Sequence, residues 1–159
     1  MSIEKVREYL KQYGMEERVL EFEASSATVD LAAEALHVDG ARICKTLSFR
    51  NKDEGAIVVQ MAGDAKVDNH KYKQTFGVKA KFLTPDEVLE FTGHPIGGVC
   101  AFGIDREDVK IYCDESLQRF DTVFPACGTG NSAIELTCDE LFRVSRAISW
   151  VDVTKLPEE

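Results

Sequence analysis

The sequence predicts a single α+β domain that spans residues 1–159, with a mixed, mainly antiparallel sheet or barrel-like sheet and helices packed around it. Segments with the two-residue alternation of strands outnumber segments with helical periodicity. Most links between consecutive strands are short, and short links favour antiparallel pairing. The length of 159 residues suits one domain, and a hydrophobic content of 44% is enough to build its core.

Helix and strand patterns alternate in the first part of the chain and lead into a hairpin. Apolar residues recur on one helical face from Ser2 to Tyr13, and Gly14 is a suitable stop for that helix. The turn-forming residues 51–55 separate two apolar runs and predict a hairpin. In order, we expect a helix at 2–13, a strand at 18–23, a helix capped by Ser25, Ser26 or Thr28 and ending at Leu36, and strands at 43–50 and 56–62.

Two capping boxes mark helix starts in the rest of the chain. Thr84 can cap a helix that has Pro85 at its first position and Glu87 as the reciprocal partner. Thr137 and Glu140 repeat this pattern. No GxGxxG motif follows a predicted strand, which excludes a doubly wound dinucleotide-binding fold. The expected order is a helix at 69–74, a strand at 78–83, a helix at 84–93, strands at 98–102, 109–113, 122–127 and 133–136, a helix at 137–146 and a strand at 150–153.

The composition excludes several classes of protein. The five cysteines form no CxxC or CxxxC pair, and the N-terminal residues contain no signal-peptide core, so we expect reduced thiols in a cytoplasmic protein. No apolar run approaches the roughly 20 residues of a membrane helix, and no close-spaced ligands indicate a metal site. The net charge of −9 argues against binding along duplex DNA. Neither a membrane, DNA, a metal nor a cofactor is therefore expected.

Lys45 is the first residue that departs from a simple core pattern. If residues 43–50 form a strand, then Lys45 shares one face with Ile43, Leu47 and Phe49, all of them apolar. A buried ammonium is costly unless it has a partner or lies in a wet cleft. Lys45 therefore either reaches solvent from a strand end or is a cation placed in a cavity to hold an anionic ligand such as a phosphate.

Two glycine-rich segments are candidates for the walls of such a site. Residues 92–103 contain four glycines, and helix C-capping explains Gly93 but not the pair Gly97-Gly98. Paired glycines let backbone N–H groups approach a ligand, for example a carbonyl or a developing oxyanion. Residues 127–132 would form a second polar wall. An ordinary tight turn and a plain hairpin loop are the alternatives.

A basic segment stands out in this acidic chain. Residues 66–81 contain five lysines and one aspartate, a local charge of +4. The segment is either a solvated helix and strand face or an anion-binding patch on an otherwise acidic body.

One cysteine has a histidine close in sequence. Cys100 and His94 would be a nucleophile and its base if they meet in the fold, whereas a buried and inert cysteine is the more usual state.

Several of these segments together resemble the YbaK/prolyl-tRNA synthetase-associated editing domain family. Members of this family are free-standing or synthetase-inserted domains that hydrolyse mischarged aminoacyl-tRNA. The resemblance covers nearly the whole chain, in order and with fitting spacing. It rests on the run at 26–38, on Ile43-Cys44-Lys45-Thr46-Leu47, on Gly63-Asp64 followed by Lys66-Val67-Asp68, on the loop at 93–103 and on the loop at Gly128 before Ile134-Glu135-Leu136.

The resemblance implies a role for each candidate residue. The family lysine falls on Lys45, which would position the 3′-terminal nucleotide, and the backbone amides of Gly98 and Val99 would polarise the aminoacyl carbonyl. Ala101, Ala126 and Ala133 stand where other members carry different residues, so the amino acid specificity stays open. We further expect Gly97, Cys100, Ala101, Gly128, Thr129, Gly130 and Asn131 to bind substrate, and Lys66, Lys71 and Lys73 to bind tRNA.

The implied activity is that of an aminoacyl-tRNA deacylase, which hydrolyses the ester between an amino acid and the terminal ribose. The sequence contains no convincing triad or metal set, so a water molecule and the neighbouring ribose hydroxyl would transfer the protons while the protein supplies orientation and electrostatic stabilisation. The expected partners are the acceptor end of the aminoacyl-tRNA and an aminoacyl-tRNA synthetase. A non-catalytic module that binds an amino acid or aminoacyl-tRNA, and a cysteine hydrolase that uses Cys100, are the alternatives.

Overall fold

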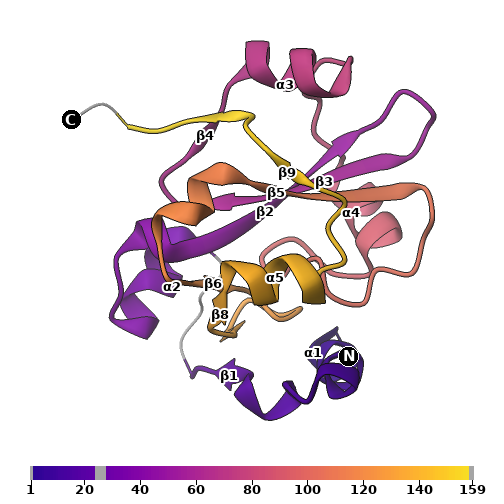
Figure 1. Cartoon of the computed structure of the whole chain (residues 1–159). Coiled ribbons are helices and arrows are strands. Elements are labelled where there is room, and N and C mark those ends of the chain that lie inside the picture. Colours follow the sequence, from indigo (N-terminus) through magenta and orange to yellow (C-terminus); the bar gives the residue numbers. More distant parts are fainter. Residues whose placement is uncertain (1, 24–27, 158–159) are drawn as a thin grey trace.

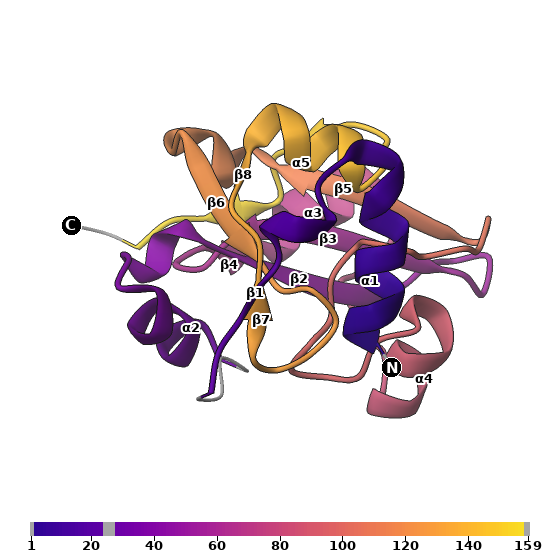
Figure 2. The same ribbon diagram turned by 90° about the horizontal axis from the view of Figure 1, so that it is seen from below.

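A mixed sheet with helices on both faces forms the centre of the computed structural model, which describes residues 2–23 and 28–157 (Figure 1). Within these residues the sheet has six strands and curls into a half-barrel (Figure 2). This confirms the predicted α+β class with a mixed sheet. In spatial order the strands are β8 (Leu136–Thr137), β6 (Thr122–Pro125), β2 (Ile43–Arg50), β3 (Ala56–Ala62), β5 (Val109–Asp114) and β9 (Trp150–Val151).

The length of each connection decides the direction of each strand pair. The short turn at 51–55 makes β2 and β3 an antiparallel hairpin, and β6 and β8 are also antiparallel. The chain between β3 and β5 is long enough for a crossover, and this pair is parallel, as are β6–β2 and β5–β9. Two small antiparallel sheets flank the main one, formed by β1 (Leu20–Glu21) with β7 (Ser132–Ala133) and by β4 (Lys66–Val67) with β10 (Thr154–Lys155).

Helices cover both faces of the sheet, with α3 on one side and α1 and α5 on the other (Figures 1 and 2). On the α1 side, Val6 and Leu10 are fully buried. On the α3 side, Tyr72 and Phe76 pack edge to face and join a buried aromatic cluster with Phe49. The helices are α1 (Ser2–Leu10), α2 (Val29–Leu36), α3 (Asn69–Phe76), α4 (Pro85–Thr92) and α5 (Cys138–Val144), and the short 3-10 turns are η1 (Lys11–Tyr13), η2 (Glu16–Arg18), η3 (Gly40–Arg42) and η4 (Glu115–Arg119).

The predicted helix starts are confirmed by their capping bonds. Thr84 accepts from Glu87 N while the Glu87 carboxylate accepts from Thr84 N, and Thr137 with Glu140 forms the same box. Thr28 caps α2 by accepting from Leu31 N at 3.1 Å, whereas the other two candidate caps, Ser25 and Ser26, lie outside the described residues. Among the described residues no helix is both long and apolar enough to span a bilayer.

Two predicted strands are wrong, each for a physical reason. Residues 98–102 form a loop between turns, because Gly97 and Gly103 adopt positive φ angles of 96° and 79° that interrupt an extended chain. Residues 78–83 are extended but form a single bridge, between Phe82 and Phe49 of β2. The predicted strand at 18–23 is reduced to β1, since Arg18 belongs to the 3-10 turn η2.

Candidate functional site

A cavity of about 450 Å³ opens at an interrupted edge of β2. At one end of this edge, Cys44 pairs with Pro125 of β6. At the other end, Leu83 N donates to Ser48 O at 3.2 Å. Between these contacts no described strand lies beside residues 45–47 on that side. The cavity fills the gap and is enclosed by α2, residues 82–88, the loop at 96–99 and residues 124–133.

The two faces of β2 give the cavity two different ends. Because side chains alternate along a strand, Lys45 and Leu47 lie on one face while Thr46 and Ser48 lie on the other. All four residues line the cavity, which therefore reaches both faces around the open edge. One end is marked by an ammonium group, and the other is enclosed largely by apolar side chains such as Val88.

Lys45 is half-buried and bound to backbone carbonyls of the turn that follows β3. Its Nζ donates to Ala65 O at 2.5 Å and to Gly63 O at 3.4 Å. Burial lowers the Lys45 pKa from its ordinary value, and the nearby carboxylate of Asp64 partly offsets that shift. The structure thus places the sequence-predicted lysine in a cavity and fixes the direction of its ammonium group.

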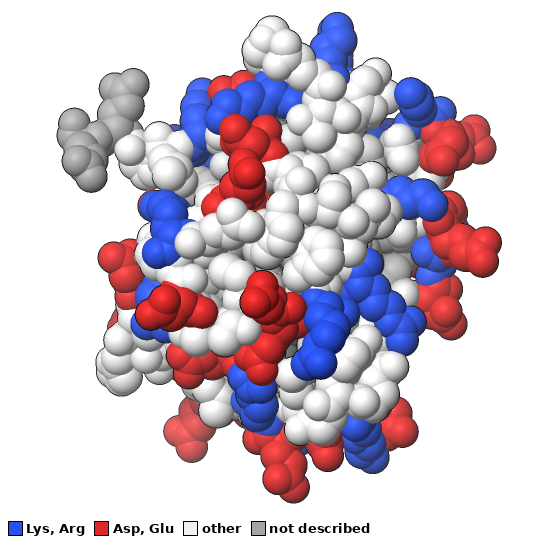
Figure 3. All heavy atoms as spheres, viewed as in Figure 1, with Lys and Arg blue, Asp and Glu red and all other residues white. Residues whose placement is uncertain are grey.

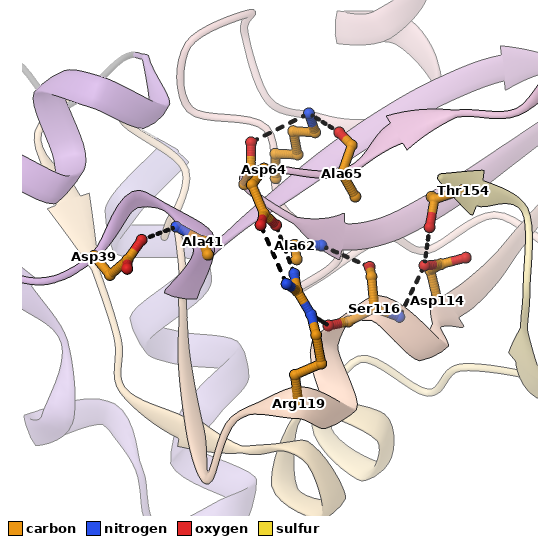
Figure 4. Close-up of polar contacts among 11 residues, drawn as sticks. Asp39, Ala41, Ala62, Asp64, Ala65, Asp114, Ser116, Arg119 and Thr154 are labelled. Carbon is orange, nitrogen blue, oxygen red and sulfur yellow. Dashed lines mark hydrogen bonds and ion pairs between the residues drawn. The ribbon is translucent and has the colours of Figure 1, made fainter. Parts of the chain in front are cut away.

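The turn at residues 63–65 is itself anchored by polar contacts (Figure 4). The guanidinium of Arg119 donates to both carboxylate oxygens of Asp64, at 2.5 and 3.1 Å, and this pairing lowers the Asp64 pKa. Arg119 Nε also donates to Ser116 O at 2.9 Å, while Ser116 Oγ accepts from Ala62 N at 3.1 Å. The carbonyls that hold Lys45 are therefore connected to η4 by hydrogen bonds on both the side chain and the main chain.

The C-terminal strand supports the same turn from the other side. Asp114 is fully buried, and its carboxylate accepts from Ser116 N at 2.9 Å, Val153 N at 2.8 Å and Thr154 Oγ1 at 2.7 Å (Figure 4). Thr154 belongs to β10, which pairs with β4 immediately after the turn. One buried carboxylate thus joins the C-terminal strand to the segment that positions Lys45.

Gly98 of the glycine pair lies where main chains pack closely, and it does not line the cavity. Gly98 N donates to Pro95 O at 3.0 Å, so this N–H closes a turn and is already engaged. A Cβ added to Gly98 would lie 2.6 Å from the Gly128 carbonyl carbon, and one added to Gly128 would lie 2.8 Å from Ser2 O. The absence of a side chain at both positions lets two loops and the start of α1 pack together, so the close approach that these glycines permit is to other main chain. Val99 lines the cavity, and no described residue accepts from its N–H.

Cys100 and His94 do meet, but away from the cavity. The Cys100 Sγ lies 3.5 Å from His94 Nε2, which is 2.8 Å from Phe102 O, and His94 Nδ1 contacts Ser2 Oγ. Both Cys100 and His94 are fully buried. Burial raises the Cys100 pKa to about 12 and lowers the His94 pKa, so the thiolate that a nucleophile requires is disfavoured. In the described residues, no group of three or more His, Cys, Asp or Glu side chains could hold a metal ion.

Of the other predicted substrate-binding residues, Gly97 lines the cavity, whereas Ala101 and the loop residues 128–131 do not. Ala101 is buried in the core beneath α4. Asn131 bonds to Phe22, whose N–H it accepts at 2.8 Å and whose carbonyl receives its Nδ2 at 3.0 Å. Gly128, Thr129 and Gly130 complete that loop, and its cavity-facing positions are instead Ala126, Ser132 and Ala133.

The three lysines expected to bind tRNA differ in their contacts. Lys71 Nζ donates to Asp152 Oδ1 at 3.0 Å and to Thr154 O at 2.9 Å, which ties α3 to the C-terminal segment. Lys66 and Lys73 are exposed and have no ion-pair partner within the described ranges. Of the three, Lys66 and Lys73 therefore present an ammonium group that no described residue pairs with.

Sequence reasoning missed two hydroxyl residues and the rim of the cavity. Thr46 Oγ1 and Ser48 Oγ are buried without a hydrogen-bond partner in the described structure. Phe82 and Ile96 line the cavity yet are 61% and 62% exposed. The two-residue period that singled out Lys45 also places Thr46 and Ser48 on the opposite face, but the sequence gives no sign that this edge of β2 is open.

Comparison with protein families matches residues 23–144 to the aminoacyl-tRNA editing domain. Among individual proteins, the uncharacterized protein YwhH of Bacillus subtilis (strain 168) is 55% identical over 155 residues, which are 98% of each chain. The proline–tRNA ligase of Thermosipho melanesiensis is 32% identical over 103 residues, 64% of this chain but only 18% of that enzyme.

Solved structures agree with these matches. A crystal structure of a protein assigned provisionally as a trans-editing enzyme for prolyl-tRNA synthetase superimposes with a TM-score of 0.86. It is 30% identical, and the alignment covers 97% of each chain. The likeness therefore extends over the whole domain rather than over one motif.

Proposed function

The chain belongs to the aminoacyl-tRNA editing domain family, and from this premise we propose that it is a trans-editing hydrolase that deacylates mischarged aminoacyl-tRNA. The bond cleaved is the ester between the amino acid and the terminal ribose. Water adds to the carbonyl carbon, the ribose oxygen leaves with a proton, and the products are a free amino acid and an uncharged tRNA. We place this activity in the cytoplasm, with a prolyl-tRNA synthetase-type enzyme as the source of the mischarged substrate.

The observation that carries the proposal is the small cavity with a fixed cation at one end. The Lys45 ammonium is held by the carbonyls of Gly63 and Ala65 and is half-buried, so it offers a preorganised positive charge to a nucleotide. A volume of about 450 Å³ accommodates an aminoacyl group beside that nucleotide. The interrupted edge of β2 connects the two positions.

Catalysis in this proposal needs little acid–base chemistry from the protein. The backbone N–H of Val99, a residue that lines the cavity, would polarise the carbonyl, and Lys45 would orient the terminal nucleotide. The neighbouring ribose hydroxyl and an ordered water molecule would carry the protons. The buried Cys100 has no part in this scheme, because its thiol pKa of about 12 and its place behind the wall separate it from the substrate.

The size of the accepted side chain would be set by the loop wall of the cavity. Ala126 and Ala133 contribute only methyl groups there. A pocket of this kind discriminates modestly, by about 1–3 kcal/mol per methylene group. Larger residues at these two positions would restrict the enzyme to smaller amino acids.

Contact with tRNA would be confined to the acceptor end. Acidic and basic side chains are interspersed on the face seen in Figure 3, so this face offers no broad basic surface, and the net charge of −9 disfavours contact along the tRNA backbone. The exposed Lys66 and Lys73 and the ammonium of Lys45 would contact a few phosphates. We expect the affinity for tRNA to depend only weakly on salt. The slope of log affinity against log salt concentration should be on the order of −2 to −4 for three or four phosphate contacts.

The decisive experiment is deacylation of a panel of mischarged tRNAs by the purified protein. Hydrolysis of at least one tRNA that depends on Lys45 and not on Cys100 supports the proposal. Binding without hydrolysis of any member favours a non-catalytic aminoacyl-tRNA binding module, and loss of hydrolysis in Cys100→Ala alone favours a thiol enzyme.

A further inference from the structure

We propose that the exposed ring of Phe82 is a stacking platform for an unpaired base at the 3′ end of the tRNA, next to the nucleotide that Lys45 holds. This inference rests on the proposed function and adds a base-binding residue to it.

Phe82 lines the cavity and exposes most of its large apolar side chain to solvent. Its side chain is 61% exposed although the residue lines the cavity. Ile96, also on the rim, is 62% exposed, so the two side chains form an apolar border at the entrance. Exposed apolar surface at the edge of a binding site indicates a contact with a ligand or partner.

The ring of Phe82 is held in place before any ligand arrives. It stacks on Phe49, with ring centroids 4.9 Å apart and an interplanar angle of 27°, and Phe49 is fully buried. The backbone on either side is fixed because Arg50 N donates to Lys81 O at 2.8 Å and Leu83 N donates to Ser48 O. One face of the ring is therefore covered by Phe49, and a base that stacks on the remaining surface meets a preorganised partner.

Phe82 lies on the same side of β2 as Lys45. Lys45 and Phe49 share one face of the strand, and Phe82 is the cross-strand partner of Phe49 and stacks on it. The two positions on β2 are four residues apart, about 13 Å along the strand. A short single-stranded segment can therefore contact the ammonium with its terminal nucleotide and the ring with a neighbouring base.

The charge around Phe82 selects a nucleic acid over an apolar protein surface. Lys79 and Lys81 precede Phe82 closely in the sequence and are exposed. No acidic residue occurs between Asp68 and Asp86 in the sequence. Single-stranded nucleic acid is bound by this combination of an aromatic ring for a base and cations for the phosphates, without a need for sequence readout.

The test measures deacylation kinetics for three variants with a substrate of the wild-type enzyme. Phe82→Ala should raise KM about tenfold while kcat changes by less than about twofold, because stacking binds the substrate away from the reacting ester. Phe82→Trp should keep KM near the wild-type value, because tryptophan also offers an aromatic face for stacking. Leu89→Ala is the matched control, since Leu89 is 53% exposed on α4 and does not line the cavity, and its KM should equal that of the wild type.

A second substrate shows whether the ring contacts a base. When the base next to the terminal adenosine is replaced by an abasic ribose, the wild type and Phe82→Ala should have the same KM. If the abasic substitution instead weakens both proteins equally, or if Phe82→Ala retains the wild-type KM, the platform does not exist.

Binding of uncharged RNA separates failure of this inference from failure of the proposed function. A wild-type protein that hydrolyses no aminoacyl-tRNA overturns the deacylase proposal. In that case the platform is tested by the affinity for an uncharged RNA hairpin ending in CCA. A lower affinity of Phe82→Ala, restored in Phe82→Trp, supports the platform, and equal affinities of all three proteins overturn it.

Discussion

The cavity has two walls that are built by different means. The lysine wall is formed by Lys45, which is held by directional hydrogen bonds through the turn at 63–65 and Arg119 although these do not line the cavity. The loop wall is formed by residues 96, 97, 99, 126, 132 and 133, and the loops that carry them pack together where Gly98 and Gly128 let main chains touch. A flexible ammonium group needs hydrogen-bond partners to fix its orientation. A loop that presents a backbone N–H needs only glycines at the points where another main chain packs against it.

This difference predicts whether a substitution in each wall changes mainly the activity or mainly the stability of the protein. Removing one hydrogen-bond partner from the lysine wall should change the activity more than the stability, because the strands beneath it stay paired. Adding one atom to the loop wall should change the stability first, because the obstructing atoms belong to the backbone and cannot move aside.

Lys45→Ala should reduce activity more than any other single substitution in the two walls. We expect kcat/KM for deacylation to fall on the order of 100-fold, since a preorganised charge is lost from a partly desolvated site. Lys45→Arg should restore little of the activity, because a planar guanidinium group does not fit the two carbonyls that hold the compact ammonium group. Circular dichroism should show an unchanged fold. Turnover of the alanine variant near the wild-type rate would remove Lys45 from the mechanism.

Gly98→Ala should destabilise the fold strongly, although it adds only one methyl group. Its Cβ would lie 2.6 Å from main-chain atoms of residues 128 and 129, and we expect a loss of about 1–3 kcal/mol in the free energy of unfolding. Gly40→Ala is the matched control, because its nearest contact would be an ordinary 3.5 Å to the Val29 side chain. Urea unfolding measures both. Equal stability of the two variants would mean that the loops do not pack through Gly98.

Asp64→Asn should lower kcat/KM by about tenfold, while the fold stays intact. The neutral amide cannot keep the paired contact with Arg119, so the turn that positions Lys45 loses a charge-assisted contact. Arg106→Ala is the control, since Arg106 forms the same two-bonded contact with Asp108, which is not part of the turn that holds Lys45. Its kinetics should match the wild type. A parallel loss in both variants would indicate a general effect of surface charge rather than positioning.

How much of this site was predictable depends on whether the relevant contact is local in sequence. The capping boxes at Thr84 and Thr137 were correct because both partners lie within one helical turn. The period of two, a local property of a strand, singled out Lys45 on an apolar face, but it left open whether the side chain reaches solvent or lies in a cavity. The strand expected at 78–83 was wrong because its partner on β2 is distant and only Phe82 pairs.

The loop wall was harder to predict for the same reason. A pair of glycines is equally compatible with a ligand and with another backbone in close approach, and only the fold shows that Gly128 lies against Gly98. The open edge of β2 results from where β6 ends and where residues 81–83 begin to pair, which no local pattern records. The roles of Thr46 and Ser48 as cavity residues were therefore missed.

The pH dependence of deacylation tests the electrostatics of the lysine wall. Burial lowers the Lys45 pKa, so activity that needs the ammonium should fall, as pH rises, at a lower pH than an ordinary lysine pKa of 10.5 would give. Asp64 raises that pKa, so Asp64→Asn should shift the alkaline limb to still lower pH. The measurement is kcat/KM against pH, corrected for hydrolysis without enzyme. An alkaline limb at the same pH in both proteins would show that Lys45 does not set it.

The smallest effects should come from the basic segment, and they should differ between its two lysines on α3. The Lys71 ammonium is occupied by Asp152 and by the Thr154 carbonyl, whereas Lys73 is exposed without an ion-pair partner in the described ranges. Lys73→Glu should therefore raise KM about twofold to threefold and flatten the salt dependence, since phosphate contacts set that slope. Lys71→Glu should instead loosen the C-terminal strand, with lower thermal stability and a smaller change in the salt slope. If Lys71→Glu flattens the salt dependence as much as Lys73→Glu does, then the Lys71 ammonium leaves Asp152 and binds a tRNA phosphate in the complex.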